Sequence, residues 1–211
     1  MKMLFLPRCG SGVTLFVFKP GWHGTYLRVI SQAYRGKHPM IDLRVYWTME
    51  LLAPAGNLES AIAAFTYGAD AVYLGLRQFS ARGDAENFSY DDLSTLLGHA
   101  HEGCGRRRSV YVAVNTLVRQ GELGGLVDTL SALRDMCPDG LIVQDWALLE
   151  LVKSRYPEFV LHASTQLAIH NVEGARRAKE LGFKRIVVAR ELTIQEIAEI
   201  ASIPGLEVEV F

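Results

Sequence analysis

This chain contains little cysteine. It also lacks long hydrophobic runs and a large net charge of either sign. None of the three cysteines forms a C-x-x-C pair, which argues against a disulfide framework and a self-contained zinc or iron–sulfur site. No run approaches the roughly 18–20 apolar residues that a membrane helix needs, so we expect no membrane partner. The formal net charge of −1 provides no general attraction to DNA or RNA. A reducing cytoplasm is the default expectation.

Charge is unevenly distributed along the 211 residues. Residues 1–48 hold seven Lys and Arg residues against one acid, a net charge of +6, so the rest of the chain carries −7. This basic segment has no hydrophobic period of 2 or 3.6, whereas a regular pattern begins at Met49. We therefore divide the chain into an N-terminal extension, 1–48, expected to be poorly ordered or mis-assigned, and a globular domain, 49–211.

Three interpretations of residues 1–48 remain open. An Arg-containing, acid-poor segment is typical of some targeting peptides, although Pro7 and Arg8 interrupt the apolar run that a secretory signal requires. The segment is alternatively a basic arm. The favoured interpretation is a translation start assigned too early, with Met49 as the true first residue.

From Met49 onward, apolar runs alternate with stretches of helical spacing. Each run of four to seven residues predicts a buried strand, and each stretch with period 3.6 predicts a helix. Strands are expected at 50–54, 71–75, 110–115, 140–144, 160–166, 184–189 and 206–211. Helices are expected at 58–67, 89–101, 122–136, 146–155, 172–181 and 194–201.

This alternation predicts an α/β fold with a parallel sheet. No G-x-G-x-x-G or G-x-x-x-x-G-K-[ST] motif follows the first strand, so a nucleotide-binding open sheet is disfavoured. We expect a TIM-type (β/α) barrel, which needs eight strands and typically about 250 residues. Seven strands are visible in the sequence, so the barrel is expected to be incomplete and the chain truncated.

Polar residues recur where the expected strands end, which is where barrel enzymes place their sites. His162 with Asp145, Glu191 or Glu209 is a candidate acid–base pair, and Arg190 is a cation for an anionic substrate. Amides and hydroxyls would orient that substrate. The full candidate set is Asn57, Tyr73, Asn115, Gln144, Asp145, His162, Ser164, Thr165, Gln166, Arg190, Glu191 and Glu209.

Several of these residues have a purely structural alternative. Asn57, Asp145 and Thr193 each precede a predicted helix and suit N-caps. Arg190 and Glu191 also suit a solvated pair at a helix start. His162, Ser164 and Gln166 are expected on one face of a strand, because side chains alternate. His162 and Ser164 are then neighbours about 7 Å apart rather than hydrogen-bonded partners.

Several motifs, in this order, resemble those of the collagenase-like peptidase family U32. The resemblance covers Met49–Phe211 and rests on 50–57 (ELLAPAGN), 67–75 (YGADAVYLG), 143–145 (VQD), 162–166 (HASTQ), 181–182 (LG) and 189–192 (AREL). It implies either a peptidase or an oxygen-independent hydroxylase of tRNA, rRNA or the ubiquinone ring.

The resemblance also implies cofactors for the hydroxylases, namely prephenate and an iron–sulfur cluster. Their cluster cysteines follow the seventh strand, and Cys9, Cys104 and Cys137 do not match them. We therefore expect no cofactor to be bound by this chain. The 82–88 loop is more acidic than is typical of the family, which weakens an anion-binding role for its backbone.

Three functions follow from these observations. The favoured one is RNA-base hydroxylation by the full-length protein, with tRNA, rRNA or a small anionic molecule as partner. A peptidase is the second, although no G-x-S-x-G elbow and no H-E-x-x-H motif is present. The third is a non-catalytic fragment.

Overall fold

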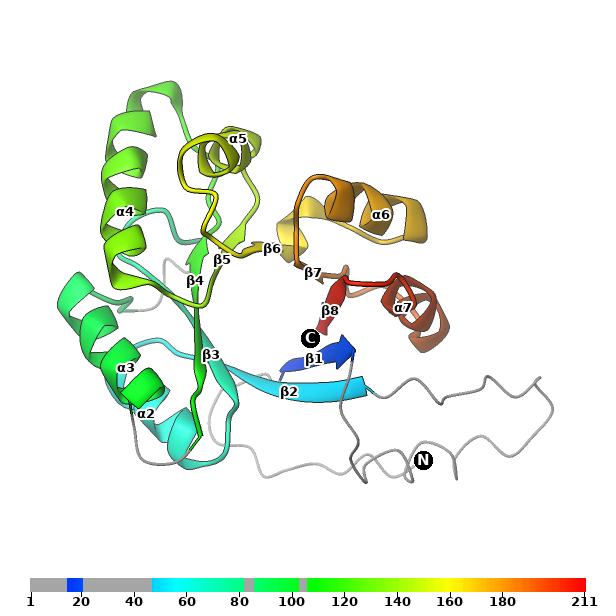
Figure 1. The fold of residues 1–211 in the computed structure, drawn as a ribbon, viewed down its shortest axis with the longest axis horizontal. Coiled ribbons are helices and arrows are strands. Elements are labelled where there is room, and N and C mark those ends of the chain that lie inside the picture. The colour runs from blue at the N-terminus through cyan, green and yellow to red at the C-terminus, as the bar shows by residue number, and fades with distance from the viewer. Residues whose placement is uncertain (1–14, 21–46, 82–85, 103–105) are drawn as a thin grey trace.

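A computed structural model of the chain describes residues 15–20, 47–81, 86–102 and 106–211, with side chains from Glu50 onward. Eight strands form a closed barrel with helices around its outside (Figure 1). The strands are β1 (Leu15–Pro20), β2 (Trp47–Pro54), β3 (Ala71–Gly75), β4 (Ser109–Val114), β5 (Gly140–Val143), β6 (Leu161–Ala163), β7 (Arg185–Val187) and β8 (Glu207–Val210).

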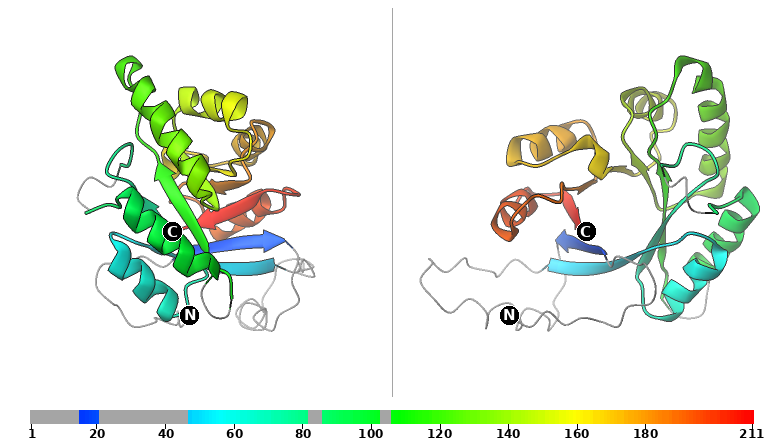
Figure 2. Two further views of the ribbon diagram at one scale, coloured as in Figure 1. Left: turned by 60° about the vertical axis from the view of Figure 1, so that its left-hand side comes forward. Right: turned by 180° about the vertical axis from the view of Figure 1, so that it is seen from behind.

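Helices connect the strands from β2 onward. They are α2 (Leu58–Thr66), α3 (Tyr90–Glu102), α4 (Leu123–Met136), α5 (Trp146–Arg155), α6 (Val172–Glu180) and α7 (Ile194–Ala201), with short 3-10 turns η2 (Gln120–Glu122) and η3 (Thr165–Leu167). Figure 2 shows these helices on the outer side of the sheet. No described helix is long and apolar enough to cross a lipid bilayer.

Strands β2 to β8 pair in sequence order and are all parallel, which confirms the predicted α/β barrel with seven parallel strands. The eighth place is occupied by β1, which runs antiparallel to both β2 and β8 (Figures 1 and 2). This strand was not expected from the sequence, because the apolar run 13–18 shows no alternation and meets Lys19 and Pro20. The rest of the predicted 1–48 extension lies outside the described residues.

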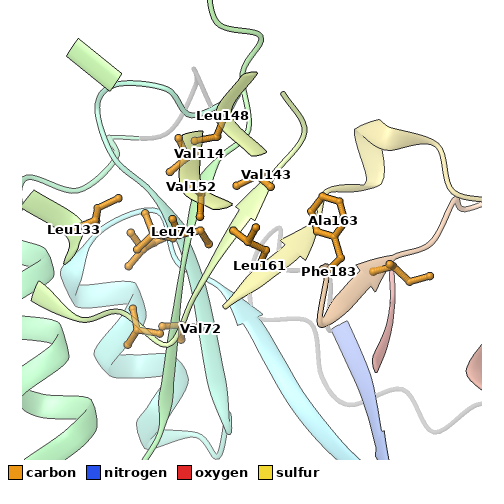
Figure 3. Close-up of a cluster of buried hydrophobic side chains, with 14 of the residues drawn as sticks. Val72, Leu74, Val114, Leu133, Val143, Leu148, Val152, Leu161, Ala163 and Phe183 are labelled. Atoms are coloured by element: carbon orange, nitrogen blue, oxygen red, sulfur yellow. The ribbon is translucent and has the colours of Figure 1, made fainter. Parts of the chain in front are cut away.

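The alternation of side chains divides the buried residues into two layers. Outward-facing Val, Leu and Ala of the strands pack against the helices, and Figure 3 shows part of this layer, including Leu74 of β3, Leu133 of α4 and Val152 of α5. A smaller apolar cluster lies inside the barrel. It consists of Leu52, Ala71, Tyr111, Ala113 and Ile142, with Tyr73 packed against it. Elsewhere in the lumen lie the buried polar and charged residues Glu50 of β2, His162 of β6, Arg185 of β7 and Glu209 of β8.

Candidate functional site

The C-terminal ends of the parallel strands form one mouth, and most of the predicted site residues lie at or near it. Asn57, directly after β2, accepts a hydrogen bond from the Ser60 amide as the N-cap of α2, and its Nδ2 donates to Glu86 Oε2 at 2.9 Å. Beside it lies an open hollow of about 510 Å³ lined by Asn57, Leu58, Glu59, Arg77, Glu86, Asn87 and Asp92. Its lining carries three carboxylates and one guanidinium, so the hollow is acidic.

The predicted amides Asn115 and Gln144 lie next to each other and hold loops together. Gln144 Nε2 donates to the Asn115 carbonyl at 2.8 Å, which joins the ends of β4 and β5. Asn115 Oδ1 accepts from the Ala81 amide at 3.0 Å and thereby fixes the loop after β3. Both side chains remain partly exposed at the mouth. They therefore combine a structural role with a position suited to contact a ligand.

Asp145 does not form the predicted acid–base pair with His162. One carboxylate oxygen accepts from the Leu148 amide at 3.0 Å, as the N-cap of α5 requires, and the other accepts from the Val118 amide at 3.1 Å. Glu191 lies exposed in the turn after β7, whereas His162 is 2% exposed inside the barrel. The structure thus brings neither carboxylate to the imidazole.

The segment 162–166 is not one continuous strand, so the expected common face of His162, Ser164 and Gln166 is wrong beyond residue 163. Strand β6 ends at Ala163, and Ser164 caps the 3-10 turn that begins at Thr165. The buried Ser164 hydroxyl donates to Gln166 Oε1 at 3.0 Å, while Gln166 itself is exposed. The physical reason is that a serine hydroxyl competes with the sheet by bonding to its own turn.

Arg190 lies exposed on the rim, in the loop between β7 and α7. Its guanidinium carbon lies 4.8 Å from the centre of the Phe211 ring, so the two side chains stack. Such a cation–π contact is worth about 0.5–1 kcal/mol at an exposed site. Tyr73 and Thr165 are both partly buried, Tyr73 against the lumen cluster.

A buried ionic network lies inside the barrel, and the sequence patterns did not predict it. We call it the lumen charge cluster, and it consists of Glu50, Tyr111, Arg185, Glu207 and Glu209. Arg185 is 1% exposed, and its Nε and Nη2 donate to Glu207 Oε2 at 2.9 and 2.7 Å. Its Nη1 donates to Glu50 Oε1 at 3.1 Å, and Nη2 also donates to the Tyr111 hydroxyl at 3.2 Å.

Tyr111 connects the cluster to His162. Its hydroxyl donates to Glu50 Oε1 at 3.0 Å, and the Arg185 guanidinium lies over its ring at 4.7 Å. The His162 ring meets the Tyr111 ring edge-on, with centroids 4.7 Å apart. On the other side of His162, a Cβ at Gly140 would lie 3.1 Å from Nε2, so the glycine makes room for the imidazole. His162 is therefore held in the lumen by close packing.

The environment of the cluster perturbs several ionisations. Burial raises the pKa of the Tyr111 phenol above its ordinary value, an effect that the Arg185 charge opposes. Burial disfavours the Arg185 charge, but Tyr111 and the three glutamates outweigh it and raise the pKa of the guanidinium. Burial also raises the pKa of Glu209 to about 7, against the attraction of Arg185. Arg185 therefore stays charged, and Glu209 titrates near neutrality.

A weak signal for this cluster exists in the sequence. Arg185 alternates with Ile186, and Glu207 and Glu209 alternate with valines, so all three share the lumen face of their strands. Charges at the start of a strand often face solvent, so this alternation alone does not indicate a buried network.

The described residues do not fit an iron–sulfur cluster. They include no group of three or more His, Cys, Asp or Glu side chains that could hold a metal ion. Cys137 is exposed at the end of α4, where its thiol donates to the Arg134 carbonyl at 3.2 Å. Cys9 and Cys104 lie outside the described part of the chain.

Comparison with known proteins agrees with this architecture. The chain is 37% identical over 163 residues to the tRNA hydroxylation protein P of Haemophilus influenzae, covering 77% of this chain and 35% of that protein. It is 38% identical over 163 residues to the 23S rRNA 5-hydroxycytidine C2501 synthase of Escherichia coli, covering 77% of this chain and 24% of that protein. The chain thus spans about a third or less of these two curated relatives.

A solved structure described as the U32 peptidase Mk0906 shares the fold, with a TM-score of 0.57 and 17% sequence identity over 74% of this chain and 65% of that one. The sequence model described as Peptidase family U32 matches residues 56–211, which include β3 to β8 and every described helix. The motifs at the strand ends lie within or beside that match. The chain belongs to peptidase family U32.

Proposed function

We propose that this chain is the barrel part of an RNA-modifying enzyme that hydroxylates a base of tRNA or rRNA. The observation that carries the proposal is the identity of 37–38% to two RNA hydroxylation proteins over 163 residues. That length is close to the 164 residues from the start of β2 to the end of β8, so the similarity is not confined to one motif. An RNA substrate implies a cytoplasmic location, and both remain parts of this proposal.

The site supports a division of roles within the chain. Arg190, exposed on the rim and stacked on Phe211, is suited to hold a carboxylate or phosphate at the mouth. Asn57, Asn115, Gln144, Thr165 and Gln166 follow the C-terminal ends of β2, β4, β5 and β6 and offer amide and hydroxyl groups for orientation, together with Tyr73 of β3 and Ser164 after β6. His162 and Glu209 lie deeper, in the lumen, where proton transfer would be shielded from water.

Oxygen-independent chemistry with prephenate and an iron–sulfur cluster is the form of hydroxylation that the family resemblance implies. The proposal assigns the cluster to sequence other than the residues described here, because these do not fit it. Arg190 is the group of this chain suited to the carboxylates of prephenate.

The test is mass spectrometry of tRNA and rRNA nucleosides from a strain in which the gene is deleted. Loss of a nucleoside that carries one additional oxygen, and its return on complementation, supports the proposal. An unchanged nucleoside profile overturns it. Complementation with an Arg190→Ala variant separates binding from folding, because Arg190 is exposed and its loss leaves the barrel intact.

Proteolysis is the second candidate, favoured by the solved family member described as a peptidase. The hydroxyl of Ser164 donates to Gln166, a geometry unlike the serine–histidine hydrogen bond that a serine peptidase needs. A gelatin-cleavage assay with the wild-type protein and a Ser164→Ala variant addresses this candidate. Equal cleavage by both proteins would exclude Ser164 as the nucleophile, and no cleavage by either would argue against a peptidase.

A further inference from the structure

The lumen charge cluster holds more negative than positive charge. Three carboxylates, from Glu50, Glu207 and Glu209, converge on the single guanidinium of Arg185. Glu207 makes the paired hydrogen bonds to Nε and Nη2, and Glu50 takes Nη1 and the Tyr111 hydroxyl. Two carboxylates and the Tyr111 hydroxyl accept four of the five N–H donors of Arg185. The third carboxylate, Glu209, lies 3.7 Å from Nη1, which carries the remaining donor, so the two groups form an ion pair without a hydrogen bond.

Glu209 is the member of the cluster with the fewest interactions. It is 1% exposed, and its Oε2 accepts no hydrogen bond from any described residue. The nearest cation, Arg185 Nη1, lies 3.7 Å away, beyond hydrogen-bond range. A buried ionised carboxylate with an oxygen that accepts no hydrogen bond is costly, so such a group tends to bind a proton.

The groups that face Glu209 come from every neighbouring strand. Glu50 of β2 and Glu207 of β8 disfavour its ionised form, while Arg185 of β7 favours it. Tyr111 of β4 and His162 of β6 complete the surroundings of the cluster. On the β1 side, the backbone register places Val17, which does not titrate, opposite Glu209. Glu209 therefore faces two carboxylates and one guanidinium in a buried environment, and these opposing effects keep its protonated and ionised forms close in free energy.

The position of Glu209 along β8 connects the cluster with the mouth. Glu207 and Glu209 lie on the same face of β8, and Phe211, the residue after the strand, stacks with Arg190 at the rim. Glu209 is thus one side-chain layer below the place where the proposed anionic substrate is held. A buried carboxylate with an oxygen that lacks a hydrogen bond is unusual in a stable interior, and such exceptions concentrate at functional sites.

We propose that Glu209 is an acid–base residue, which exchanges a proton with a heterocyclic base seated at the mouth above it. In one direction, an N–H, O–H or C–H bond of the substrate breaks, its electron pair stays on the substrate, and the proton forms an O–H bond on the Glu209 carboxylate. The reverse step returns that proton. The identity of the substrate rests on the proposed function, whereas the proton-binding property of Glu209 does not.

The titration of Glu209 favours this role. Proton transfer is fastest when the pKa of the acid–base group lies near the working pH. Burial raises the pKa of Glu209 to about 7, so both protonation states are populated at neutrality. An ordinary exposed glutamate would be almost fully ionised there.

The first experiment measures the proton directly on the full chain. Carbon-13 NMR of labelled glutamate carboxyl groups is recorded against pH for the wild-type protein and for Glu209→Gln, which identifies the Glu209 signal by its loss. We expect a midpoint near 7. A midpoint at or below that of an exposed glutamate would overturn the proposal. Because glutamine resembles the protonated carboxyl in shape, the variant should fold, and circular dichroism checks this.

The second experiment measures the modification. Complementation of the deletion strain with Glu209→Gln should lower the hydroxylated nucleoside at least about 100-fold, the usual contribution of an acid–base group. With the purified full-length enzyme, the inflection near neutral pH should vanish in the variant. Glu199→Gln, an exposed glutamate of α7, is the matched control and should behave like the wild type. A wild-type rate and pH profile in Glu209→Gln would overturn the proposal. Absence of the hydroxylated nucleoside in the wild type would instead overturn the proposed function. The NMR titration of Glu209 would then decide whether Glu209 binds a proton near neutral pH.

Discussion

Replacing Arg185 by methionine should destabilise the barrel strongly. The change keeps much of the apolar stem but removes the guanidinium that Glu50 and Glu207 share. Both carboxylates are nearly buried, with side chains 8% and 12% exposed, so water cannot replace the lost donors. Removing one partner of a buried ion pair typically costs about 3–5 kcal/mol. That loss is a large share of the roughly 5–15 kcal/mol by which native proteins are stable.

Urea denaturation followed by circular dichroism measures the effect. With a denaturant slope of about 2 kcal/mol per molar, the unfolding midpoint should fall by about 2 M. The matched control is Arg177→Met on α6, because Arg177 pairs with Glu180 at 3.1 Å with both side chains more than 60% exposed. Exposed pairs contribute at most about 1 kcal/mol, so this variant should change little. Equal midpoints for the two variants would refute the argument that burial makes the Arg185 pair important.

Three further predictions concern stability. The free energy of unfolding should fall by up to about 3 kcal/mol as the pH rises from about 4.5 to 7, because folded Glu209 binds its proton more tightly than the unfolded chain does. Urea titrations across that pH range should show this decrease in the wild-type protein and not in Glu209→Gln. Asp145→Ala should cost about 1–2 kcal/mol by uncapping α5, with a drop in the thermal midpoint, and a rescue of most of that loss by Asp145→Asn would confirm the cap. Leu130→Ala, at a fully buried position of α4, should cost about 2–5 kcal/mol in the same assay, and a loss below 1 kcal/mol would contradict the packing described here.

Local signals in the sequence were sufficient for most of the fold. Apolar runs located all seven parallel strands, because both faces of a barrel strand are buried. The N-cap interpretation of Asn57, Asp145 and Thr193 is confirmed, since each side chain accepts a hydrogen bond from the first turn of its helix. Capping depends on residues three or four positions apart, which is why the sequence alone reveals it.

Features that depend on distant residues were not predictable in the same way. The contacts of Arg185 with Glu50 and Tyr111 join positions 135 and 74 residues apart, and no local period reports them. The antiparallel strand β1 was missed for a similar reason, because its partners β2 and β8 define it rather than its own sequence. The end of β6 at Ala163 reflects a competition between the Ser164 hydroxyl and the sheet, which only the folded geometry decides.

The placement of charge within the lumen has a consequence for the order in which the barrel folds. Apart from Glu50, the β2–β5 side has a largely apolar interior and local βα connections, so it is suited to collapse early, as chains with short-range contacts do. The Arg185 ion pairs form only after β7 and β8 have been synthesised and have reached Glu50, which precedes Arg185 by 135 residues. Burial of Arg185 before then would leave a charge in a dry interior. The network should therefore act as a late, all-or-none step that commits β6–β8 to the barrel.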